Sequence, residues 1–254
     1  APPEQAAAYL AGEFRPEDTL VLAGSSYNAI RYRDPTFKAY LLDELDRAAV
    51  DRDLASGKYS NLVLLDKEGF ALPENFVGVT TRTFERDLLV LPKASTVWLA
   101  AYRPLDELHD RDLALPAGPV HLGTPEDVRY VMEGWYRPET VAGVAARWTD
   151  RQARLRLWVD RAANAKLLLD GAAYPPGQQL TVLVNGQPAA SMAMSRDWAP
   201  YNIALPAALF HAEAINTITL EHTMAVSAYE ATQGQSLDRR PLAAAYSSFE
   251  LTWR

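Results

Sequence analysis

The chain has 254 residues, enough for one large domain or two ordinary ones, and its 48% hydrophobic and 22% charged residues are typical of a globular protein with a sizeable core. A net charge of −7, with acids and bases mixed along the chain, argues against binding to nucleic acid or to an anionic lipid surface. Cysteine is absent, which excludes thiolate catalysis, cysteine-ligated metals and disulfides.

Residues 1–112 switch between helical and strand periodicity, which predicts a small α/β domain. The pattern favours helices over Pro3–Phe14 and Phe37–Leu54, and buried strands over Thr19–Gly24, Asn61–Asp66 and Ser95–Ala101. The order strand, helix, strand indicates a βαβ unit and a small, mostly parallel sheet.

Residues 119–254 have a different pattern, in which short runs alternate apolar and polar positions between turn residues. We expect strands over Ala153–Val159, Leu180–Val184, Pro188–Met194, Trp198–Leu205, Asn216–Glu221 and Ser248–Trp253. Asn185-Gly186 between the second and third of these is a strong hairpin signal. The sequence therefore predicts an antiparallel β-sandwich or barrel, joined to the α/β domain by a linker over Leu113–Gly118.

Motifs for catalysis or for metal and nucleotide binding have little support in this sequence. His109, His121, His211 and His222 show no metal-ligand spacing, and no GxSxG elbow is present. Gly24-Ser25-Ser26 follows a predicted strand, but a phosphate-binding glycine pattern is missing, so an ordinary turn is favoured. The many carboxylates leave open a glycosidase-type pair, which sequence alone cannot place.

Aromatic residues beside acids and an arginine mark the second half as a candidate carbohydrate-binding surface. A sugar ring stacks on an aromatic face while charged groups bond its hydroxyls. The candidate ligand-binding residues are Trp135, Tyr136, Glu139, Trp148, Trp198, Asp238 and Arg239. The alternative is structural, with the tryptophans in the core and Arg239 in an internal ion pair with Asp238 or Glu139. Exposure of at least two of the aromatic residues beside a groove would favour binding.

The second half also carries an ordered series of motifs. They are Leu122-Gly123, Asp127, Gly134-Trp135-Tyr136, Pro138-Glu139, Arg147-Trp148-Thr149, Val184-Asn185-Gly186, Trp198, Tyr201, Leu205-Pro206, Asn216, Ile218, Leu220, Ser236, Asp238, Arg239 and Leu242. This series resembles the C-terminal extracytoplasmic region of bacterial multi-pass membrane glycosyltransferases of the dolichyl-phosphate-mannose mannosyltransferase-like superfamily. The first half resembles, less specifically, the segment that follows the last membrane helix in such proteins.

The resemblance implies a jelly-roll sandwich of the galactose-binding or carbohydrate-binding-module type. It implies a non-catalytic, extracytoplasmic domain, tethered to a membrane in the full-length protein, that binds a carbohydrate or glycolipid or positions an acceptor. No catalytic residue is carried over, and no cofactor is expected beyond a structural calcium, for which Asp127 is the candidate ligand. Two alternatives stay open: a sandwich that packs on its own membrane domain or on a partner, and an independent glycan-active enzyme.

The start of the chain and its apolar runs bear on targeting. Ala1-Pro2-Pro3-Glu4 lacks the basic and apolar regions of a signal peptide, and no apolar run approaches the ~20 residues that span a bilayer. We therefore expect that, in an extracytoplasmic protein, the targeting or anchoring segment has been removed from this sequence.

Overall fold

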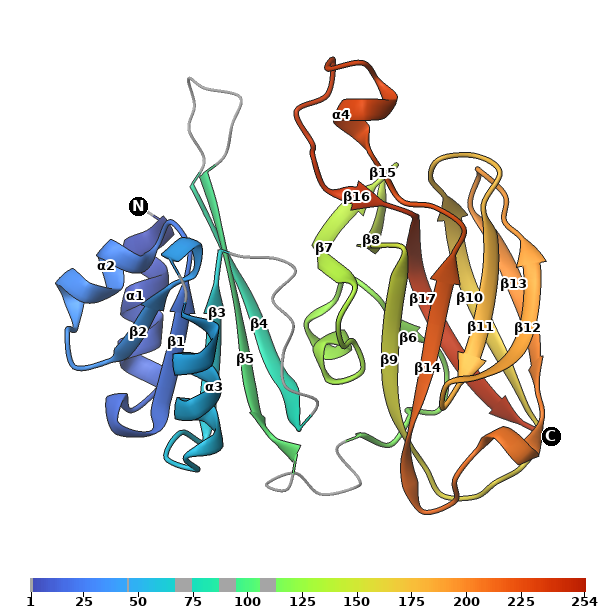
Figure 1. Cartoon of the computed structure of the whole chain (residues 1–254), viewed down its shortest axis with the longest axis horizontal. Coiled ribbons are helices and arrows are strands. Elements are labelled where there is room, and N and C mark those ends of the chain that lie inside the picture. The colour runs from blue at the N-terminus through green and yellow to red at the C-terminus, as the bar shows by residue number, and fades with distance from the viewer. Residues whose placement is uncertain (1, 45, 67–74, 87–94, 106–112) are drawn as a thin grey trace. The chain divides into compact units, whose positions relative to one another are not determined.

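A computed structural model describes residues 2–44, 46–66, 75–86, 95–105 and 113–254 (Figure 1). The chain divides into two compact units, Ala1–Leu108 and His109–Arg254. The predicted linker, Leu113–Gly118, lies at the start of the second unit. No helix in the described ranges is long and apolar enough to cross a membrane.

Over the residues that the structure describes, the first unit is one five-stranded sheet with three α-helices. The helices are α1 (Pro2–Glu13), α2 (Tyr27–Arg33) and α3 (Arg47–Ala55), and the strands are β1 (Thr19–Ala23), β2 (Lys38–Leu41), β3 (Asn61–Leu65), β4 (Phe76–Arg86) and β5 (Ser95–Pro104). The strand order is β2-β1-β3-β5-β4. Strands β1, β2 and β3 are mutually parallel, whereas β5 is antiparallel to both of its neighbours.

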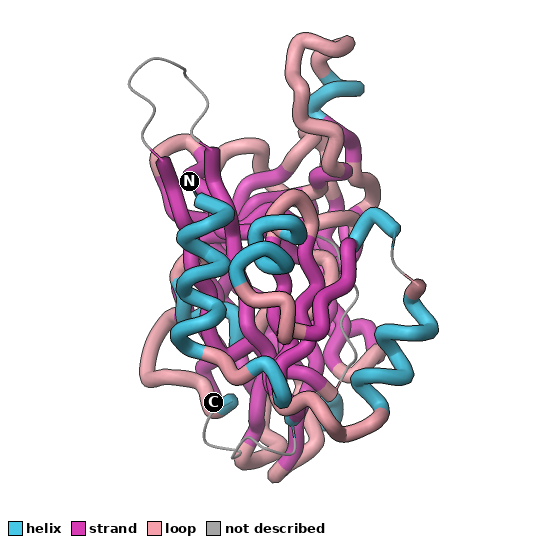
Figure 2. The backbone as a smooth tube through the Cα atoms, turned by 90° about the vertical axis from the view of Figure 1, so that its left-hand side faces the viewer, coloured by secondary structure: helices cyan, strands magenta, loops and turns pink. Residues whose placement is uncertain are grey.

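The continuous apolar runs form the buried strands that they predict. All five residues of β1 and all five of β3 are buried, as expected of strands that are covered on both faces. Helix α1 packs Ala6, Ala7 and Leu10 into one hydrophobic cluster with residues of β1, β3 and β5. In Figure 2, α1 begins at the N-terminal label and runs along the strands of this sheet.

Two predictions for this unit need correction. The predicted helix over Phe37–Leu54 is instead a strand, β2, followed by α3, because residues 38–41 pair in parallel with β1 and tertiary pairing overrides local propensity. Helix α3 starts after Asp46, whose carboxylate accepts a hydrogen bond from the Ala49 amide. The sheet is mixed rather than mostly parallel, because the predicted third strand, β5, runs antiparallel to β3.

The second unit is an antiparallel β-sandwich, which confirms the predicted fold of this half. One sheet has the order β13-β10-β17-β8-β7, with β6 beside β17, and the other has the order β12-β11-β14-β9. The strands are β6 (Val120–His121), β7 (Trp135–Val141), β8 (Val144–Thr149), β9 (Gln152–Val159), β10 (Ala165–Ala173), β11 (Gln179–Val184), β12 (Gln187–Ala193), β13 (Ala199–Leu205), β14 (Ala214–His222) and β17 (Ala244–Trp253).

Strand alternation builds the core between these two sheets. Leu155, Leu157 and Val159 of β9 are buried in one hydrophobic cluster with residues of the opposite sheet, as their spacing predicts. The Asn185-Gly186 turn joins β11 to β12, and both residues have positive φ angles of 50° and 78°. Strand β12 forms an edge of its sheet and carries Pro188.

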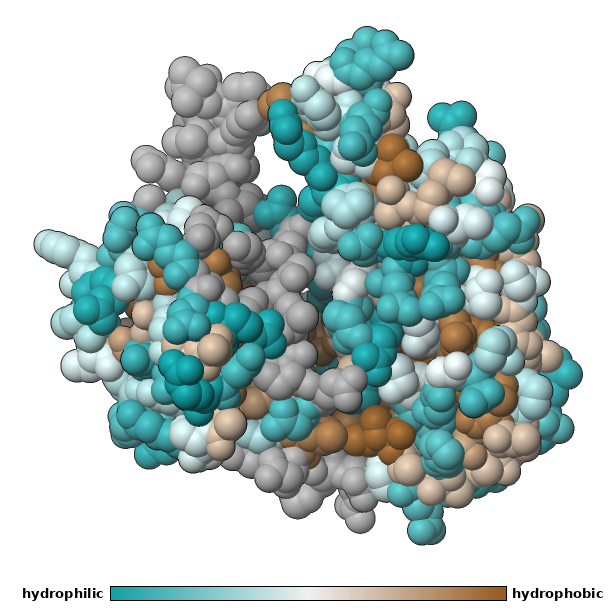
Figure 3. Space-filling view, viewed as in Figure 1, coloured by the Kyte–Doolittle hydropathy of each residue, from teal (hydrophilic) through white to brown (hydrophobic). Residues whose placement is uncertain are grey.

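A segment projects from one end of the sandwich (Figure 1). It contains β15 (Val226–Ser227), α4 (Ala228–Ala231) and β16 (Pro241–Leu242), and β15 pairs with β16 at its base. Ser227 and Glu230 form a reciprocal capping box at the start of α4. Hydrophilic residues cover most of this segment in Figure 3. It also contains Asp238, Arg239 and Arg240, and the Arg240 side chain contacts Glu139 of the edge strand β7.

Candidate functional site

A β-bulge in β7 sets the geometry of the candidate site. Trp135 pairs with Thr149 and Pro138 pairs with Arg147, so two residues of β7, Tyr136 and Arg137, lie opposite the single residue Trp148. A bulge of this kind redirects side chains and often lies beside functional sites.

Trp135 itself belongs to the sandwich core. Its side chain is 8% exposed, its Nε1 donates to the Arg154 carbonyl at 2.8 Å, and its ring meets Tyr246 edge-on at 5.9 Å. The preceding Gly134 has a φ of +84°, and a Cβ there would lie 1.8 Å from the Gln152 carbonyl oxygen. The Gly-Trp pair is therefore explained by packing, and we assign Trp135 a structural role.

Arg240 is the centre of the candidate site. Its Nη1 and Nη2 lie 2.6 and 3.1 Å from the two carboxylate oxygens of Glu139. Its Nε and Nη2 also donate to the carboxylate of Asp238, at 3.0 and 2.7 Å. The guanidinium lies 5.2 Å from the centre of the Tyr136 ring, and Arg137 donates to Glu139 at 3.4 Å. We call these five residues the Arg240 cluster.

Backbone contacts hold the Arg240 cluster in place. The Tyr136 hydroxyl donates to the Pro241 carbonyl at 3.0 Å, which joins β7 to β16. Asp238 accepts a hydrogen bond from the Arg240 amide, and the Asp238 carbonyl accepts one from the amide of Tyr229 in α4. The bonds from Arg240 hold the pKa of the Asp238 carboxyl below its usual value. Asp238 is therefore ionised near neutral pH.

The ion pairs that the sequence analysis considered for Arg239 are made by its neighbour, Arg240. Arg239 makes neither of the predicted ion pairs: its exposed side chain lies over the Tyr229 ring at 4.2 Å from the centroid. Arg240, the next residue, takes that place. Two adjacent arginines in an irregular segment carry no periodicity that could have told them apart.

Two half-exposed aromatic rings lie near the bulge. Trp148 meets Tyr174 edge-on, with the ring centroids 5.9 Å apart. The neighbours of Trp148 on β8, Arg147 and Thr149, are buried, so strand alternation directs Trp148 to the outer face of the sheet. Tyr174 was not predicted, because it follows the end of β10 with no motif around it.

Trp198 lies elsewhere. It is half-exposed and precedes β13, which forms the edge of the sheet opposite β7. The structure thus brings together Tyr136, Glu139 and Asp238 of the predicted residues, with Trp148 across the bulge. It separates Trp198 from them and places Trp135 in the core.

Asp127 forms a buried ion pair. Arg147 donates to both of its carboxylate oxygens, at 2.5 and 2.6 Å, and the Gly123 amide donates to Oδ2 at 2.6 Å. Both oxygens of this fully buried carboxylate therefore accept hydrogen bonds, and the Arg147 guanidinium compensates the charge that would attract a calcium ion. In the described part of the chain, no group of three or more His, Cys, Asp or Glu residues could hold a metal ion. These residues do not fit a calcium site at Asp127.

One histidine is buried in the sandwich core. The Nε2 of His222 lies 2.9 Å from the Tyr246 hydroxyl, and its Nδ1 lies 3.2 Å from the Arg151 carbonyl. Burial lowers the pKa of His222 to about 4, so the ring is neutral at physiological pH. His121 and His211 lie at exposed positions, and His109 falls outside the described residues.

The contacts of the cluster limit its chemistry. Glu139 and Asp238 share the guanidinium of Arg240, so neither provides the unpaired carboxylate that a glycosidase acid or nucleophile requires. Glu139 accepts three hydrogen bonds and keeps acceptor capacity, whereas both oxygens of Asp238 accept two contacts each from Arg240. The side chains of Arg240, Glu139 and Asp238 remain 23%, 24% and 28% exposed. Glu139 can therefore accept a further hydrogen bond from a hydroxyl group, while the Tyr136 ring beside it is buried.

Comparison with known proteins gives distant structural likenesses. No family model and no curated protein matches the sequence. The CBM36-1 domain of a multidomain xylanase from the hindgut metagenome of Trinervitermes trinervoides aligns over 54% of this chain and 97% of its own, with 11% identity and a TM-score of 0.34.

Two further structures align over a similar share of the chain. A CBM36 carbohydrate-binding module in complex with calcium and xylotriose covers 53% of this chain and 99% of its own, with 12% identity and a TM-score of 0.31. The module CBM6cm-2 of Cellvibrio mixtus lichenase 5A, in complex with cellotriose, covers 55% and 99%, with 9% identity and a TM-score of 0.35. Values this low assign neither a family nor a ligand to this chain.

Proposed function

We propose that the β-sandwich is a non-catalytic carbohydrate-binding domain. The observation that carries this proposal is the convergence of Tyr136, Glu139 and Asp238 on Arg240, from segments about a hundred residues apart in the chain. Carboxylates fixed by a guanidinium beside an aromatic ring suit the recognition of hydroxyl groups. Trp148 and Tyr174 would offer the apolar face on which a sugar ring stacks.

The cellular setting is a further part of the proposal. The resemblance of the motif series supports an extracytoplasmic domain of a membrane glycosyltransferase-like protein, in which the sandwich binds a glycan or glycolipid or positions an acceptor. Cell fractionation tests this setting. The protein should stay with the membrane fraction, and protease added from the outside should cleave the sandwich. A soluble cytoplasmic protein would contradict it.

A structural role for the sandwich is the second candidate. It is favoured by the burial of Trp135 and Tyr136 and by the pairing of both acids with Arg240. In that case the Arg240 cluster fixes the projecting segment to β7, and the sandwich packs on its own membrane domain or on a partner. The two candidates differ in whether the isolated chain binds a glycan.

A glycan array probed with the whole chain separates these candidates. Trp148→Ala should reduce binding at least about tenfold, because stacking on an aromatic face is lost. Trp198→Ala is the matched control, since it removes a half-exposed tryptophan at the opposite edge of the sheet and should leave binding unchanged. Failure of the unmodified chain to bind any glycan would contradict carbohydrate binding and leave the structural role.

A further inference from the structure

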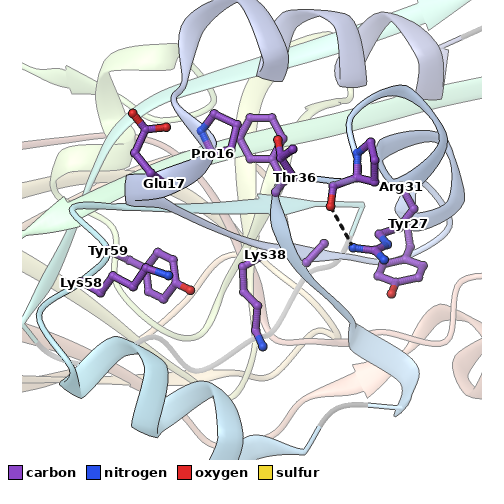
Figure 4. A pocket seen from close by; sticks show the side chains of 11 residues that line it. Pro16, Glu17, Tyr27, Arg31, Thr36, Lys38, Lys58 and Tyr59 are labelled. Atoms are coloured by element: carbon purple, nitrogen blue, oxygen red, sulfur yellow. Dashed lines mark hydrogen bonds between the residues drawn. The ribbon is translucent and has the colours of Figure 1, made fainter.

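The first unit contains a surface pocket of about 470 Å³ at one edge of its sheet. It is lined mainly by residues that precede or begin β1, β2 and β3, so it lies at the amino ends of the three parallel strands. Its charged and tyrosine residues are Glu17, Tyr27, Arg31, Lys38, Lys58 and Tyr59. In Figure 4, Lys58 and Tyr59 stand on one side of the pocket and Tyr27 and Arg31 on the other, with Lys38 between them.

The charge of this lining is opposite to that of the chain. Three cationic side chains and one carboxylate, that of Glu17, line the pocket of a protein with a net charge of −7. Neither Arg31 nor Lys58 makes an ion pair with a carboxylate of the described residues: Arg31 donates to the Pro35 carbonyl, and Lys58 lies over the Tyr59 ring. Lys38 lies 3.8 Å from the Asp53 carboxylate and over the Tyr40 ring, at 5.0 Å from the centroid.

At the other ends of these strands, their carboxyl ends, side chains form hydrogen bonds with one another and with the backbone. In open α/β sheets, ligands usually bind at the carboxyl ends of the strands where the strand order reverses, here between β1 and β3. At that point Asp66 accepts hydrogen bonds from the Ser25 hydroxyl, the Ser26 amide and the Ser26 hydroxyl. These contacts occupy the Asp66 carboxylate, whereas at the amino ends of the strands three cations face one lining carboxylate, Glu17, and the more distant Asp53.

We propose that this pocket binds a phosphate monoester of a small hydroxylated compound, such as a sugar phosphate. Lysine and arginine side chains are the usual binders of phosphate in proteins, and a doubly charged group matches several cations better than a carboxylate does. The half-exposed ring of Tyr27 adds aromatic surface for the organic part, and the volume falls within the range of small-molecule sites. This site is independent of the sandwich and of its proposed glycan.

Calorimetric titration of the whole chain with glucose 6-phosphate, inorganic phosphate and glucose tests the proposal. Glucose 6-phosphate should bind more tightly than inorganic phosphate, and glucose should not bind. Lys58→Glu and Arg31→Glu should each weaken binding at least about tenfold, which corresponds to 1.4 kcal/mol. Both side chains are exposed, so the variants should fold, and circular dichroism checks this. Lys58→Gln and Arg31→Gln, expected to weaken binding less, replace any variant that does not fold.

Arg33→Glu provides the matched control. It makes the same change of charge on the same helix, α2, at an exposed residue that does not line the pocket, and it should alter affinity less than about twofold. An equal loss of affinity for glucose 6-phosphate in Arg33→Glu would show that the attraction is nonspecific, and it would overturn the proposed site. Absence of heat with glucose 6-phosphate would also overturn it. Sedimentation with phosphatidate vesicles, without binding of glucose 6-phosphate, would overturn the small-ligand assignment.

Discussion

Two arginines in the sandwich hold carboxylates in the same bidentate manner but in opposite surroundings. Arg147 and Asp127 are 3% and 0% exposed, and the third guanidinium nitrogen of Arg147 donates to the Tyr136 carbonyl. Arg240 holds two carboxylates and remains about a quarter exposed. Burial rather than bonding geometry therefore separates a contact that fixes the fold from one that a ligand can still reach.

Removal of the buried arginine should have the largest effect. Arg147→Ala leaves the carboxylate of Asp127 buried without its partner, which should reduce the free energy of unfolding by about 3–5 kcal/mol. Urea denaturation measures this change. The double variant Asp127→Leu, Arg147→Leu should recover part of the loss, because no buried charge is left uncompensated. If Arg147→Ala lowers the free energy of unfolding no more than Arg240→Ala does, burial does not explain a difference in role between the two arginines.

The buried side chain of His222 should make the stability of the protein sensitive to acid. Above pH 6.5 the imidazole is neutral in both the folded and the unfolded chain, so it contributes nothing to pH dependence. As the pH falls from 6.5 to about 4, the unfolded chain binds a proton that the folded chain does not, and the free energy of unfolding drops by about 3 kcal/mol in total.

Unfolding curves at pH 7 and at pH 4.5 measure this drop. His222→Gln keeps a polar side chain near Tyr246 but cannot titrate, so its stability should change less between the two pH values. If the free energy of unfolding of His222→Gln falls between pH 7 and pH 4.5 as much as that of the unmodified chain, other groups cause the acid sensitivity.

Removal of the half-exposed arginine should cost far less stability. Arg240→Ala should reduce the free energy of unfolding by about 1 kcal/mol, because solvent screens the two carboxylates that it leaves behind. Thermal unfolding measures the change, and Arg239→Ala, one residue away, should cost less than about 0.5 kcal/mol. If Arg240→Ala instead lowers the free energy of unfolding as much as Arg147→Ala does, the Arg240 cluster stabilises the fold in the same way as the buried ion pair of Arg147.

Titration of Asp238 should give the smallest effect. The folded-state pKa of its carboxyl lies below the ordinary value of 3.8, so its contribution to stability is present above that value and is lost as the pH falls through the folded pKa. Asp238→Asn should therefore flatten the stability profile below about pH 4 by a small amount. The comparison is made by denaturation between pH 5 and pH 2.5, and an unchanged profile would contradict the pairing with Arg240.

Local patterns predicted the fold of the second unit well, because its strands obey period-2 alternation. Leu155, Leu157 and Val159 face the core as expected, and Asn185-Gly186 makes the hairpin turn. The first unit was harder to predict. Residues 38–41 form a strand only because β1 lies beside them, and such pairing cannot be read from a short segment.

The candidate site was predictable in composition but not in geometry. Tyr136, Glu139 and Asp238 do meet, yet the β-bulge that places Tyr136 opposite Trp148 was not predicted, because Pro138 fits a bulge and an edge strand equally well. Trp135 and Tyr136 are adjacent, and only the fold shows that the first fills the core while the second contacts Arg240. The pocket of the first unit gathers residues from four segments, none of which carries a motif.

The edge strand β12 has a consequence for association between copies of the chain. An exposed sheet edge can be extended by a strand of another molecule, and this is a common route to aggregation. Pro188 lacks an amide hydrogen, and the register shift between Val182 and Leu183 leaves Ala189 as an extra residue on β12. Together they interrupt the row of donors and acceptors that an incoming strand would need, so β12 is protected against templating intermolecular sheets.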